Sequence, residues 1–347
     1  MSIIENVQNY FDKRGNKALG LTGKTEISVL GKGESNLNLL ARNGKKEFVV
    51  RVSLLEKSRT EREYNALKSI ESLKIAPRAY ILDTSHKFVD EDFSVIEKLP
   101  GTHLLGNIST EDVQIIARTL SKLHSKKYPR FGQIDGKPQI GNLYDALTER
   151  RGWVSYEFGK LRDEIIRNNK PADLKQSILP TLVKLNEALN DICLENKQFF
   201  SGSGFSVVHG DLRQWNLLKH PDGISLIDWE LARIADPMED IANFFVNSYI
   251  SESNKKVFMD EYSGSSEDKN LEKRVAVYEL LQSMGIAFWF GKNYYYNRGK
   301  KLHQELNTPE REKEYLNDFF HFISESMKKS YLGPRMTSSK ARRLGRL

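Results

Sequence analysis

The residues that could do chemistry lie close together in one part of the chain. The stretch "VVHGDLRQWNLL" (207–218) places Asp211 and Asn216 between apolar runs, and the next apolar run, in "LIDWE", ends at Asp228. A hairpin would bring these three side chains to one edge. Carboxylate and amide oxygens suit Mg²⁺, which usually takes one or two protein carboxylates together with substrate phosphates. A carboxylate left free beside that metal can accept the proton of a hydroxyl that attacks phosphorus.

A purely structural interpretation competes with this one, because Asp and Asn often only fix turns. The ordered set of His209, Asp211, Asn216 and Asp228 favours phosphoryl transfer over turn formation. A hydrolase built on His209 lacks its nucleophile, because the chain has no Gly-x-Ser-x-Gly motif. The single cysteine, Cys193, excludes a disulfide framework and a cysteine-rich metal site.

A glycine-rich turn upstream offers a place for nucleotide phosphates. In "LGKGESNLNLL", Gly31 and Gly33 let the backbone approach a phosphate, and Ser35 and Asn36 can donate hydrogen bonds. A Gly-x-Gly pair is a weak signal by itself, but its position upstream of the catalytic set strengthens it. The turn is not a P-loop, because no Gly-x4-Gly-Lys-Ser/Thr sequence is present.

The elements that must position these residues change character at Pro100-Gly101. Before it, a helical spacing over 3–12 is followed by three strand-like runs joined by short turns, among them the hairpin signal Asn43-Gly44. A helix is predicted over 58–73, and two more strands follow it. Residues 1–99 should therefore form a small lobe of about five strands and a helix.

After Pro100-Gly101 the spacing is mainly helical. A helix capped by Ser109 or Thr110 is expected first, and residues 153–200 should be mostly helical, with a break near Pro171 and a second candidate break at Pro180. A late helix should open at Thr308-Pro309. The 347 residues thus predict an α+β protein with two domains or lobes.

The net charge of +7 does not indicate a nucleic-acid-binding protein. Residues 333–347 contain five basic residues and no acid, so the rest of the chain is close to neutral. We expect this tail to be solvated and disordered rather than a nucleic-acid arm. No apolar run is long enough to span a membrane, and the N-terminus lacks the pattern of a signal peptide. A cytoplasmic protein is the default expectation.

The catalytic stretch also resembles a known family. "HGDLRQWNLL" followed by "LIDWE" is similar to the aminoglycoside phosphotransferases and choline kinases, which are relatives of protein kinases. "LSKLHS" and "ADPMEDIANFF", with Asp236, Pro237 and Asp240, resemble further segments of that family, and the resemblance covers roughly residues 25–250. It implies a protein-kinase-like two-lobed fold with a nucleotide-binding N-lobe (1–99), a mainly helical C-lobe (100–333) and the basic tail (334–347).

The resemblance implies a role for each residue of the catalytic stretch. Asp211 would be the catalytic base, and Asn216 and Asp228 would be the Mg²⁺ ligands. His209 would be structural, packing beneath the loop and bonding to the backbone, and Asp240 would hold the catalytic loop. Arg213 could touch the transferred phosphoryl group, although a solvated surface position is an equal alternative.

The nucleotide side follows from the same resemblance. A kinase needs a cation on the third strand, paired to a helix Glu, and here that cation is Arg51, in "FVVRV", with Glu63 as its partner. Arg can bind phosphate in a bidentate manner. Lys32 in the glycine-rich turn is the competing phosphate ligand. "VIEKLPG" matches the hinge, where backbone groups of Glu97 to Leu99 would meet a purine.

We therefore expect a kinase that uses Mg²⁺ and ATP, or GTP, to phosphorylate a hydroxyl of a small molecule such as an aminoglycoside, amino alcohol or sugar. A choline or ethanolamine kinase is the narrower alternative, and a nucleotide-binding pseudokinase or adaptor is another. A protein kinase is disfavoured, because Asp228 and Asp236 lie too close together for an activation segment. The aromatic run within 288–296 could bind a quaternary ammonium group, but core packing is the stronger interpretation. Oligomeric state stays open.

Overall fold

A computed structural model describes residues 2–33, 35–55, 59–134, 136–137, 139–167, 172–202, 204–264, 268–296, 314 and 317–326. The chain divides into two compact units. The first unit comprises Met1–Gln139, Phe205–Asp240 and Ile250–Gly264, and the second comprises Ile140–Gly204, Ile241–Tyr249 and Ser265–Leu347. The lobe boundary predicted at Pro100 lies inside the first unit and stays a prediction.

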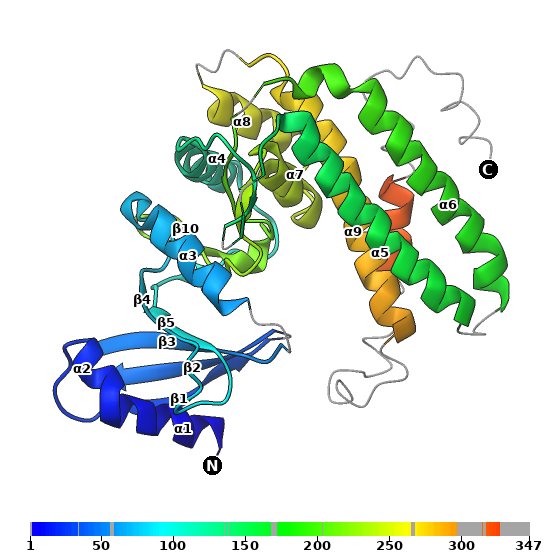
Figure 1. Cartoon of the computed structure of the whole chain (residues 1–347). Coiled ribbons are helices and arrows are strands. Elements are labelled where there is room, and N and C mark those ends of the chain that lie inside the picture. Colours follow the sequence, from blue (N-terminus) through cyan, green and yellow to red (C-terminus); the bar gives the residue numbers. More distant parts are fainter. Residues whose placement is uncertain are drawn as a thin grey trace. The chain divides into compact units, whose positions relative to one another are not determined.

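A five-stranded antiparallel sheet begins the first unit, as the sequence predicts (Figure 1). Its strand order is β1-β2-β3-β5-β4. The strands are β1 (Glu26–Lys32), β2 (Asn36–Asn43), β3 (Lys46–Ser53), β4 (Ala79–Asp83) and β5 (Phe93–Glu97). Gly44, at φ +59°, turns the chain between β2 and β3, which are paired from Asn36↔Ser53 to Asn43↔Lys46. This long, regular hairpin fixes which residues of β3 face the site.

Two helical segments pack against this sheet. Helix α1 (Ile3–Tyr10) starts with a capping box of Ser2 and Glu5 and continues into the π-helical turn η1 (Phe11–Gly15) and the short α2 (Asn16–Ala18). Val7 and Phe11 are fully buried against apolar residues of the sheet. Helix α3 (Thr60–Ile70) ends in the 3-10 turn η2 (Glu71–Leu73) and buries one face, including Glu63.

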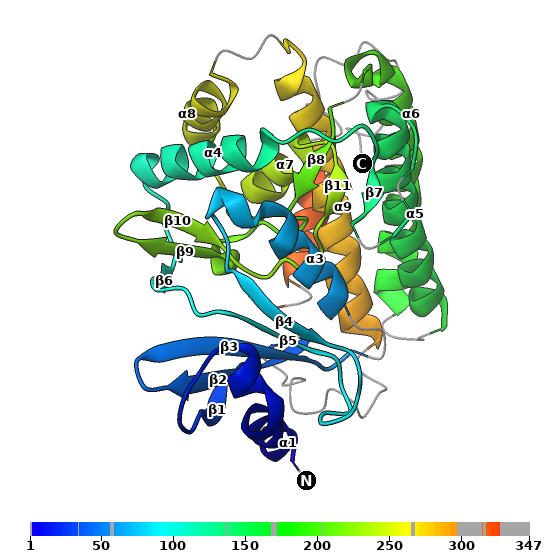
Figure 2. The same cartoon turned by 60° about the vertical axis from the view of Figure 1, so that its left-hand side comes forward.

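The remainder of the first unit surrounds the catalytic stretch with short strands and helices (Figure 2). Helix α4 (Thr110–His124), capped by Ser109, lies beside α8 (Glu252–Ser263). Two three-stranded sheets, in the orders β10-β9-β6 and β7-β11-β8, hold the loops of the candidate site. Their strands are β6 (Thr102–His103), β7 (Gly132–Gln133), β8 (Ser206–Val208), β9 (Leu217–His220), β10 (Gly223–Leu226) and β11 (Arg233–Ala235). Helix α7 (Met238–Asn247) follows β11; its first residues, to Asp240, belong to the first unit and the rest to the second.

The second unit is helical over its described residues. It contains α5 (Leu143–Arg167), α6 (Ala172–Glu195), the 3-10 turn η3 (Lys197–Phe200), α9 (Leu271–Tyr296) and further helical residues at 317–326. Pro180 lies inside α6 and does not end it, and the break predicted near Pro171 falls between the last described residue of α5, Arg167, and the first of α6, Ala172. Phe288 and Tyr294 are buried, which agrees with core packing of the aromatic run.

The fold class is α+β, as predicted, with an antiparallel sheet first and a mainly helical part after it. The helix expected at Thr308-Pro309 and the basic tail lie outside the described residues. No helix among the described residues is both long and apolar enough to cross a membrane.

Candidate active site

The loop that contains Asp211 begins after β8 ends at Val208, and the buried side chain of His209 supports it. The imidazole Nε2 lies 2.8 Å from the carbonyl oxygen of Ile227 and, because a carbonyl can only accept, carries the proton. Nδ1 then accepts the backbone N–H of Asp211 at 3.3 Å. The ring is fully buried and packs against Trp229, with 4.6 Å between ring centroids. His209 therefore has the structural position that the sequence predicts.

Asp240, at the start of α7, holds the same loop through its backbone. Its two carboxylate oxygens accept the N–H of His209 at 2.7 Å and of Gly210 at 2.9 Å. Gly210 has φ +80°, and a Cβ there would lie 2.4 Å from the carbonyl oxygen of Leu231, so only glycine fits. The predicted role of Asp240 in holding the loop is borne out by these contacts.

A buried histidine completes the support of Asp240. His124, at the end of α4, has Nε2 3.3 Å from the Asp240 carboxylate and Nδ1 2.9 Å from the hydroxyl of Tyr262. Burial by itself would raise the pKa of Asp240, but the hydrogen bond and charge of His124, with His209 and the Gly210 N–H, hold it below the usual value. The carboxylate is thus kept ionised in a fully buried place.

Asp211 lies at the surface end of the loop and is joined to Asn216. The amide nitrogen of Asn216, in the 3-10 turn η4 (Gln214–Asn216), donates to the Asp211 backbone oxygen at 2.7 Å and to Oδ2 at 3.0 Å. Nε of Arg213 lies 3.1 Å from the same Oδ2. Asn216 is buried, the Asp211 side chain is 24% exposed and Arg213 is half exposed. Asp211 is therefore oriented on one side and open to solvent on the other.

Asp228 is brought to this loop by a backbone hydrogen bond from the preceding residue. The N–H of Ile227 donates to the carbonyl oxygen of Asn216 at 3.0 Å. Asp228 itself has φ +69°, a left-handed conformation that costs a non-glycine residue free energy and often occurs at functional sites. Its Oδ1 accepts from Nη2 of Arg51 at 2.7 Å.

Arg51 connects three elements in the interior of the unit. Projecting from β3, it places Nε 2.7 Å from Oε2 of Glu63 on α3, in addition to its contact with Asp228. Burial alone would lower the pKa of Arg51, but Glu63 and Asp228 raise it overall. Burial raises the pKa of Glu63 to about 7; Arg51 opposes the rise, and the carboxylates of Asp228 and Glu230 add to it. The predicted pairing of Arg51 with Glu63 is present.

The glycine-rich turn is tied to the Asp228 loop through Glu230. Gly31 lies in β1, and the N–H of Gly33 donates to the carbonyl oxygen of Asn36 at 2.9 Å. The Asn36 side chain donates to Oε2 of Glu230 at 2.8 Å, and Nη1 of Arg59 lies 3.1 Å from Oε1. The position of Glu230 two residues after Asp228 was the one signal in the sequence for this connection.

Ser35 precedes β2, and the hinge residues begin at the end of β5; their contact with a nucleotide stays a prediction. The carbonyl oxygen of Ser35 accepts the N–H of Leu54 at 2.8 Å. Glu97 ends β5, and its N–H already donates to the carbonyl oxygen of Arg78 at 2.8 Å. The N–H of Glu97 is therefore occupied, which leaves the carbonyl of Glu97 and the backbone of Lys98 and Leu99 for a purine.

The donor set fits a metal that is shared with phosphates. The side-chain nitrogen of Asn216 donates to Asp211, which leaves the side-chain oxygen Oδ1 of Asn216 for a metal. Asp228 likewise has a second carboxylate oxygen besides the one that Arg51 contacts. Among the described residues no group of three or more His, Cys, Asp or Glu side chains could hold a metal ion. Two oxygen ligands suit Mg²⁺ bound together with a nucleotide, and do not suit an ion held by the protein alone.

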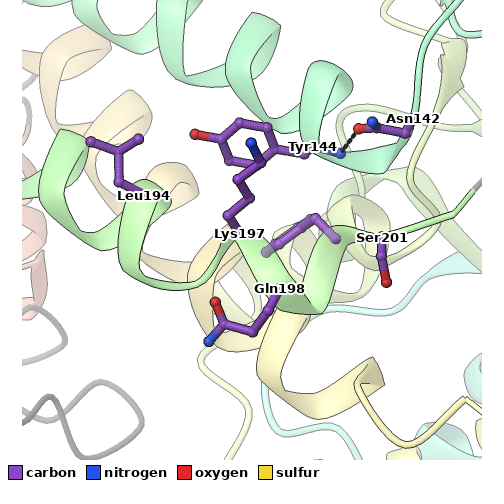
Figure 3. Close-up of a pocket in the computed structure, with 7 residues that line it drawn as sticks. Asn142, Tyr144, Leu194, Lys197, Gln198 and Ser201 are labelled. Carbon is purple, nitrogen blue, oxygen red and sulfur yellow. Dashed lines mark hydrogen bonds between the residues drawn. The ribbon is translucent and has the colours of Figure 1, made fainter.

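A hollow of about 520 Å³ lies in the second unit and contains no predicted site residue (Figure 3). Lys197 lies over the ring of Tyr144, with Nζ 4.9 Å from its centroid, and the N–H of Tyr144 donates to Asn142 Oδ1 at 2.9 Å. The lining includes no carboxylate and no histidine. It therefore offers neither a carboxylate nor an imidazole as a general base.

Comparison with known proteins assigns the family. The sequence model of the phosphotransferase enzyme family matches residues 26–268, a range that includes every residue of the candidate site. The chain belongs to the phosphotransferase enzyme family. A curated relative, a protein LicA homolog of Metamycoplasma hominis, is 34% identical over 115 residues, which are 31% of this chain and 43% of that protein. A second, acyl-CoA dehydrogenase family member 11 of Homo sapiens, is 24% identical and matches 71% of this chain and 31% of its own length. The matches thus span less than half the length of these curated relatives.

Solved structures of an aminoglycoside phosphotransferase and of ethanolamine and choline kinases share the fold of this chain. A putative aminoglycoside phosphotransferase of Ralstonia eutropha has a TM-score of 0.65 at 16% identity, covering 95% of this chain and 99% of that one. An ethanolamine kinase of Plasmodium vivax has a TM-score of 0.64 at 16% identity, covering 97% and 89%. The choline kinase LicA of Streptococcus pneumoniae has a TM-score of 0.58 at 18% identity, covering 91% and 98%. These neighbours support the kinase-like α+β fold.

Proposed function

We propose that this protein transfers the γ-phosphoryl group of ATP to a hydroxyl of a small molecule. The observation that carries the proposal is Arg51, a buried cation that contacts both Glu63 and Asp228 at 2.7 Å. A buried charge of this kind is costly unless it is paired, and phosphoryl transfer relies on such fixed charges for positioning and electrostatic stabilisation. The resemblance in sequence and fold supports the same reaction.

The nucleotide side holds the phosphates. Arg51 would contact them while Glu63 keeps it in place, and the turn around Gly31, Gly33, Ser35 and Asn36 would cover them. Asn216 and Asp228 would hold Mg²⁺, which when bound neutralises charge on the phosphates. The purine base of the nucleotide would contact the backbone of Leu99 and the carbonyl oxygen of Glu97. An adenine nucleotide is favoured, because LicA, one of the structural neighbours, was solved in complex with AMP.

The acceptor side supplies the base. Asp211, oriented by Asn216, would accept the hydroxyl proton as the hydroxyl oxygen forms its bond to the γ-phosphorus and the bond from phosphorus to the β-phosphate oxygen breaks. Arg213 would leave its ion pair with Asp211 and stabilise negative charge on the transferred phosphoryl group. The products would be ADP and a phosphate monoester. Because the reaction consumes ATP, we place it in the cytoplasm.

An acceptor screen tests the proposal. ADP formation is followed with Mg-ATP and, separately, choline, ethanolamine, glucose and kanamycin, for wild-type protein and for Asp211→Asn. We expect ADP release that depends on one acceptor class and falls at least about 10²-fold in the variant, since removing a general base typically costs 10²–10⁴-fold. ADP release that no acceptor stimulates, or that Asp211→Asn leaves unchanged, would reject the proposal.

A further inference from the structure

One aromatic side chain of the catalytic loop faces solvent. Trp215 is 59% exposed, although its neighbours Leu212, Asn216 and Leu217 are all buried. An indole is large and apolar, so leaving it exposed forfeits a considerable burial free energy. Exposed aromatic surface next to reactive groups is typical of a binding surface.

The exposed indole is held in place by the segment that follows the hinge. Nδ1 of His103 lies 2.7 Å from the carbonyl oxygen of Trp215, and the two rings lie 5.6 Å apart at 56°. The N–H of Gly106 donates to Oε1 of Gln214 at 2.9 Å, and His103 is itself in β6, paired with Leu218 of β9. Trp215 and His103 therefore form a fixed pair of rings, which we name the Trp215 platform.

The position of the platform indicates which substrate would meet it. Trp215 directly precedes Asn216, whose amide contacts the Asp211 carboxylate at 3.0 Å. The nucleotide has its own contacts elsewhere, in the β1–β2 turn, on Arg51 and at the hinge. In the proposed reaction the molecule that approaches Asp211 is the hydroxyl acceptor, and Trp215 lies four residues after Asp211 in the same loop, so we assign the acceptor to the platform.

The chemistry of the platform indicates which part of the acceptor it would contact. The carbonyl of Trp215 can only accept, so His103 carries its proton on Nδ1 and offers Nε2 as an acceptor. The indole offers a flat face with negative charge above the ring. Polarised C–H groups pack well on such a face, and both a sugar ring and a trimethylammonium group present them.

We propose that Trp215 determines acceptor specificity, with its indole packing against a C–H-rich face of the acceptor while Asp211 receives the hydroxyl. This inference rests on the proposed phosphotransferase function. Trp215 touches substrate in this account but takes no part in bond making. Its loss should therefore change the acceptor KM more than kcat, and the ATP KM least.

Steady-state kinetics of Trp215→Ala and Trp215→Phe test the inference, with whichever of choline, ethanolamine, glucose and kanamycin the wild type phosphorylates. We expect Trp215→Ala to raise the acceptor KM about tenfold, the size of a lost aromatic stacking contact, and to leave the ATP KM within about twofold. Trp215→Phe should recover most of the loss, because it keeps an aromatic face. Tyr156→Ala removes an equally exposed ring, 61%, from α5 and serves as the matched control.

The outcomes separate the inference from the function beneath it. A larger loss with choline than with ethanolamine identifies a trimethylammonium group on the platform, and a loss with glucose or kanamycin identifies a sugar face; either supports the inference. A normal acceptor KM in Trp215→Ala, or an equal rise in the ATP and acceptor KM, overturns the inference alone. A wild type that phosphorylates none of the four acceptors overturns the proposed function, and the inference with it.

Discussion

The nucleotide side and the acceptor side of the candidate site are built in opposite ways. On the nucleotide side, Arg51, Glu63 and Asp228 come from β3, α3 and the loop after β10; the Arg51 and Glu63 side chains are only 10% and 3% exposed, and Asp228, at 30%, is the member of this network that reaches solvent. On the acceptor side, Asp211 and Trp215 come from one short loop and are partly or largely open to solvent. The ion network of Arg51 forms only when three separate elements have folded together, whereas the loop of Asp211 is a local structure that the buried side chains of His209 and Asp240 hold in place.

This difference separates two kinds of energetic consequence. Removing one member of a buried ion network leaves a charge without its partner and destabilises the fold. Exposed ion pairs such as Arg213 with Asp211 contribute little to stability, because water screens them. Substitutions on the nucleotide side should therefore affect folding and activity together, whereas those of solvent-exposed residues on the acceptor side should affect activity alone.

The largest effect is expected at Arg51. Arg51→Ala should lower kcat about 10²–10³-fold, the usual result of removing one preorganised charge contact, and destabilise the fold by about 3 kcal/mol. Arg51→Lys should retain part of the activity, because it keeps the charge and loses the bidentate geometry. Steady-state kinetics and thermal unfolding measure both. Arg42→Ala, which removes a more exposed arginine of β2 that pairs with Glu47, is the control and should change neither. Normal kcat/KM for ATP in Arg51→Ala would transfer the phosphate role to Lys32.

The second largest effect is expected at Asp240, which holds the loop of Asp211 through backbone N–H groups. Asp240→Asn replaces an acceptor oxygen by a donor facing the N–H groups of His209 and Gly210, and should destabilise the protein by about 2 kcal/mol. Because the folded-state pKa of Asp240 is lowered, its contribution is present above the unfolded value of 3.8 and is lost as the pH falls through the folded value. The difference in Tm between wild type and variant should hold from about pH 7 to pH 5 and shrink below about pH 4. A difference that grows on acidification would contradict this origin.

A smaller and more selective effect is expected at Arg213. Arg213→Ala should change the free energy of unfolding by less than about 0.5 kcal/mol, because the ion pair is half exposed. If Arg213 stabilises the transferred group, kcat should fall about tenfold while the ATP KM stays nearly constant. Denaturant unfolding and acceptor kinetics measure the two quantities. A kcat equal to that of the wild type would leave Arg213 as a solvated residue of the loop.

The smallest effect is expected from the basic tail, which belongs to neither side of the site. Deleting residues 335–347 should leave kcat and Tm unchanged, since the segment carries charge without an apolar run that could join a core. The comparison is made between the full and shortened chains under the same salt conditions. A substantial fall in either quantity would give the tail a part in fold or catalysis.

The grouping of polar residues in the acceptor-side loop could be predicted from the sequence, because these residues lie close together in the chain. Asp211, Asn216 and the supporting His209 lie within one stretch, and Asp228 ends the next apolar run, so local spacing predicts their proximity. Arg51 and Glu63 required the family resemblance, because strand and helix periodicity does not say which polar residues pair across a domain.

Other features could not be read from sequence for physical reasons. The hydrogen bond from Asn36 to Glu230 joins residues 194 positions apart and leaves no periodic signal. Pro180 was a candidate helix break, but α6 continues through it, since a proline can be accommodated in a helix that kinks or loses one hydrogen bond. The exposure of Trp215 depends on how the segment after the hinge packs, which the apolar pattern does not reveal.

The central claim is that one loop carries the base while a separate buried network holds the nucleotide. Its most direct test is the paired measurement of phosphorylated acceptor and Mg-ATP affinity in Asp211→Asn and Asp228→Asn, with product identified by mass spectrometry and Kd by calorimetry. The account predicts that Asp211→Asn loses product formation and keeps the wild-type Kd within about twofold, whereas Asp228→Asn weakens Mg-ATP binding about tenfold or more. Normal product formation in Asp211→Asn, or an unchanged Mg-ATP Kd in Asp228→Asn, would contradict it.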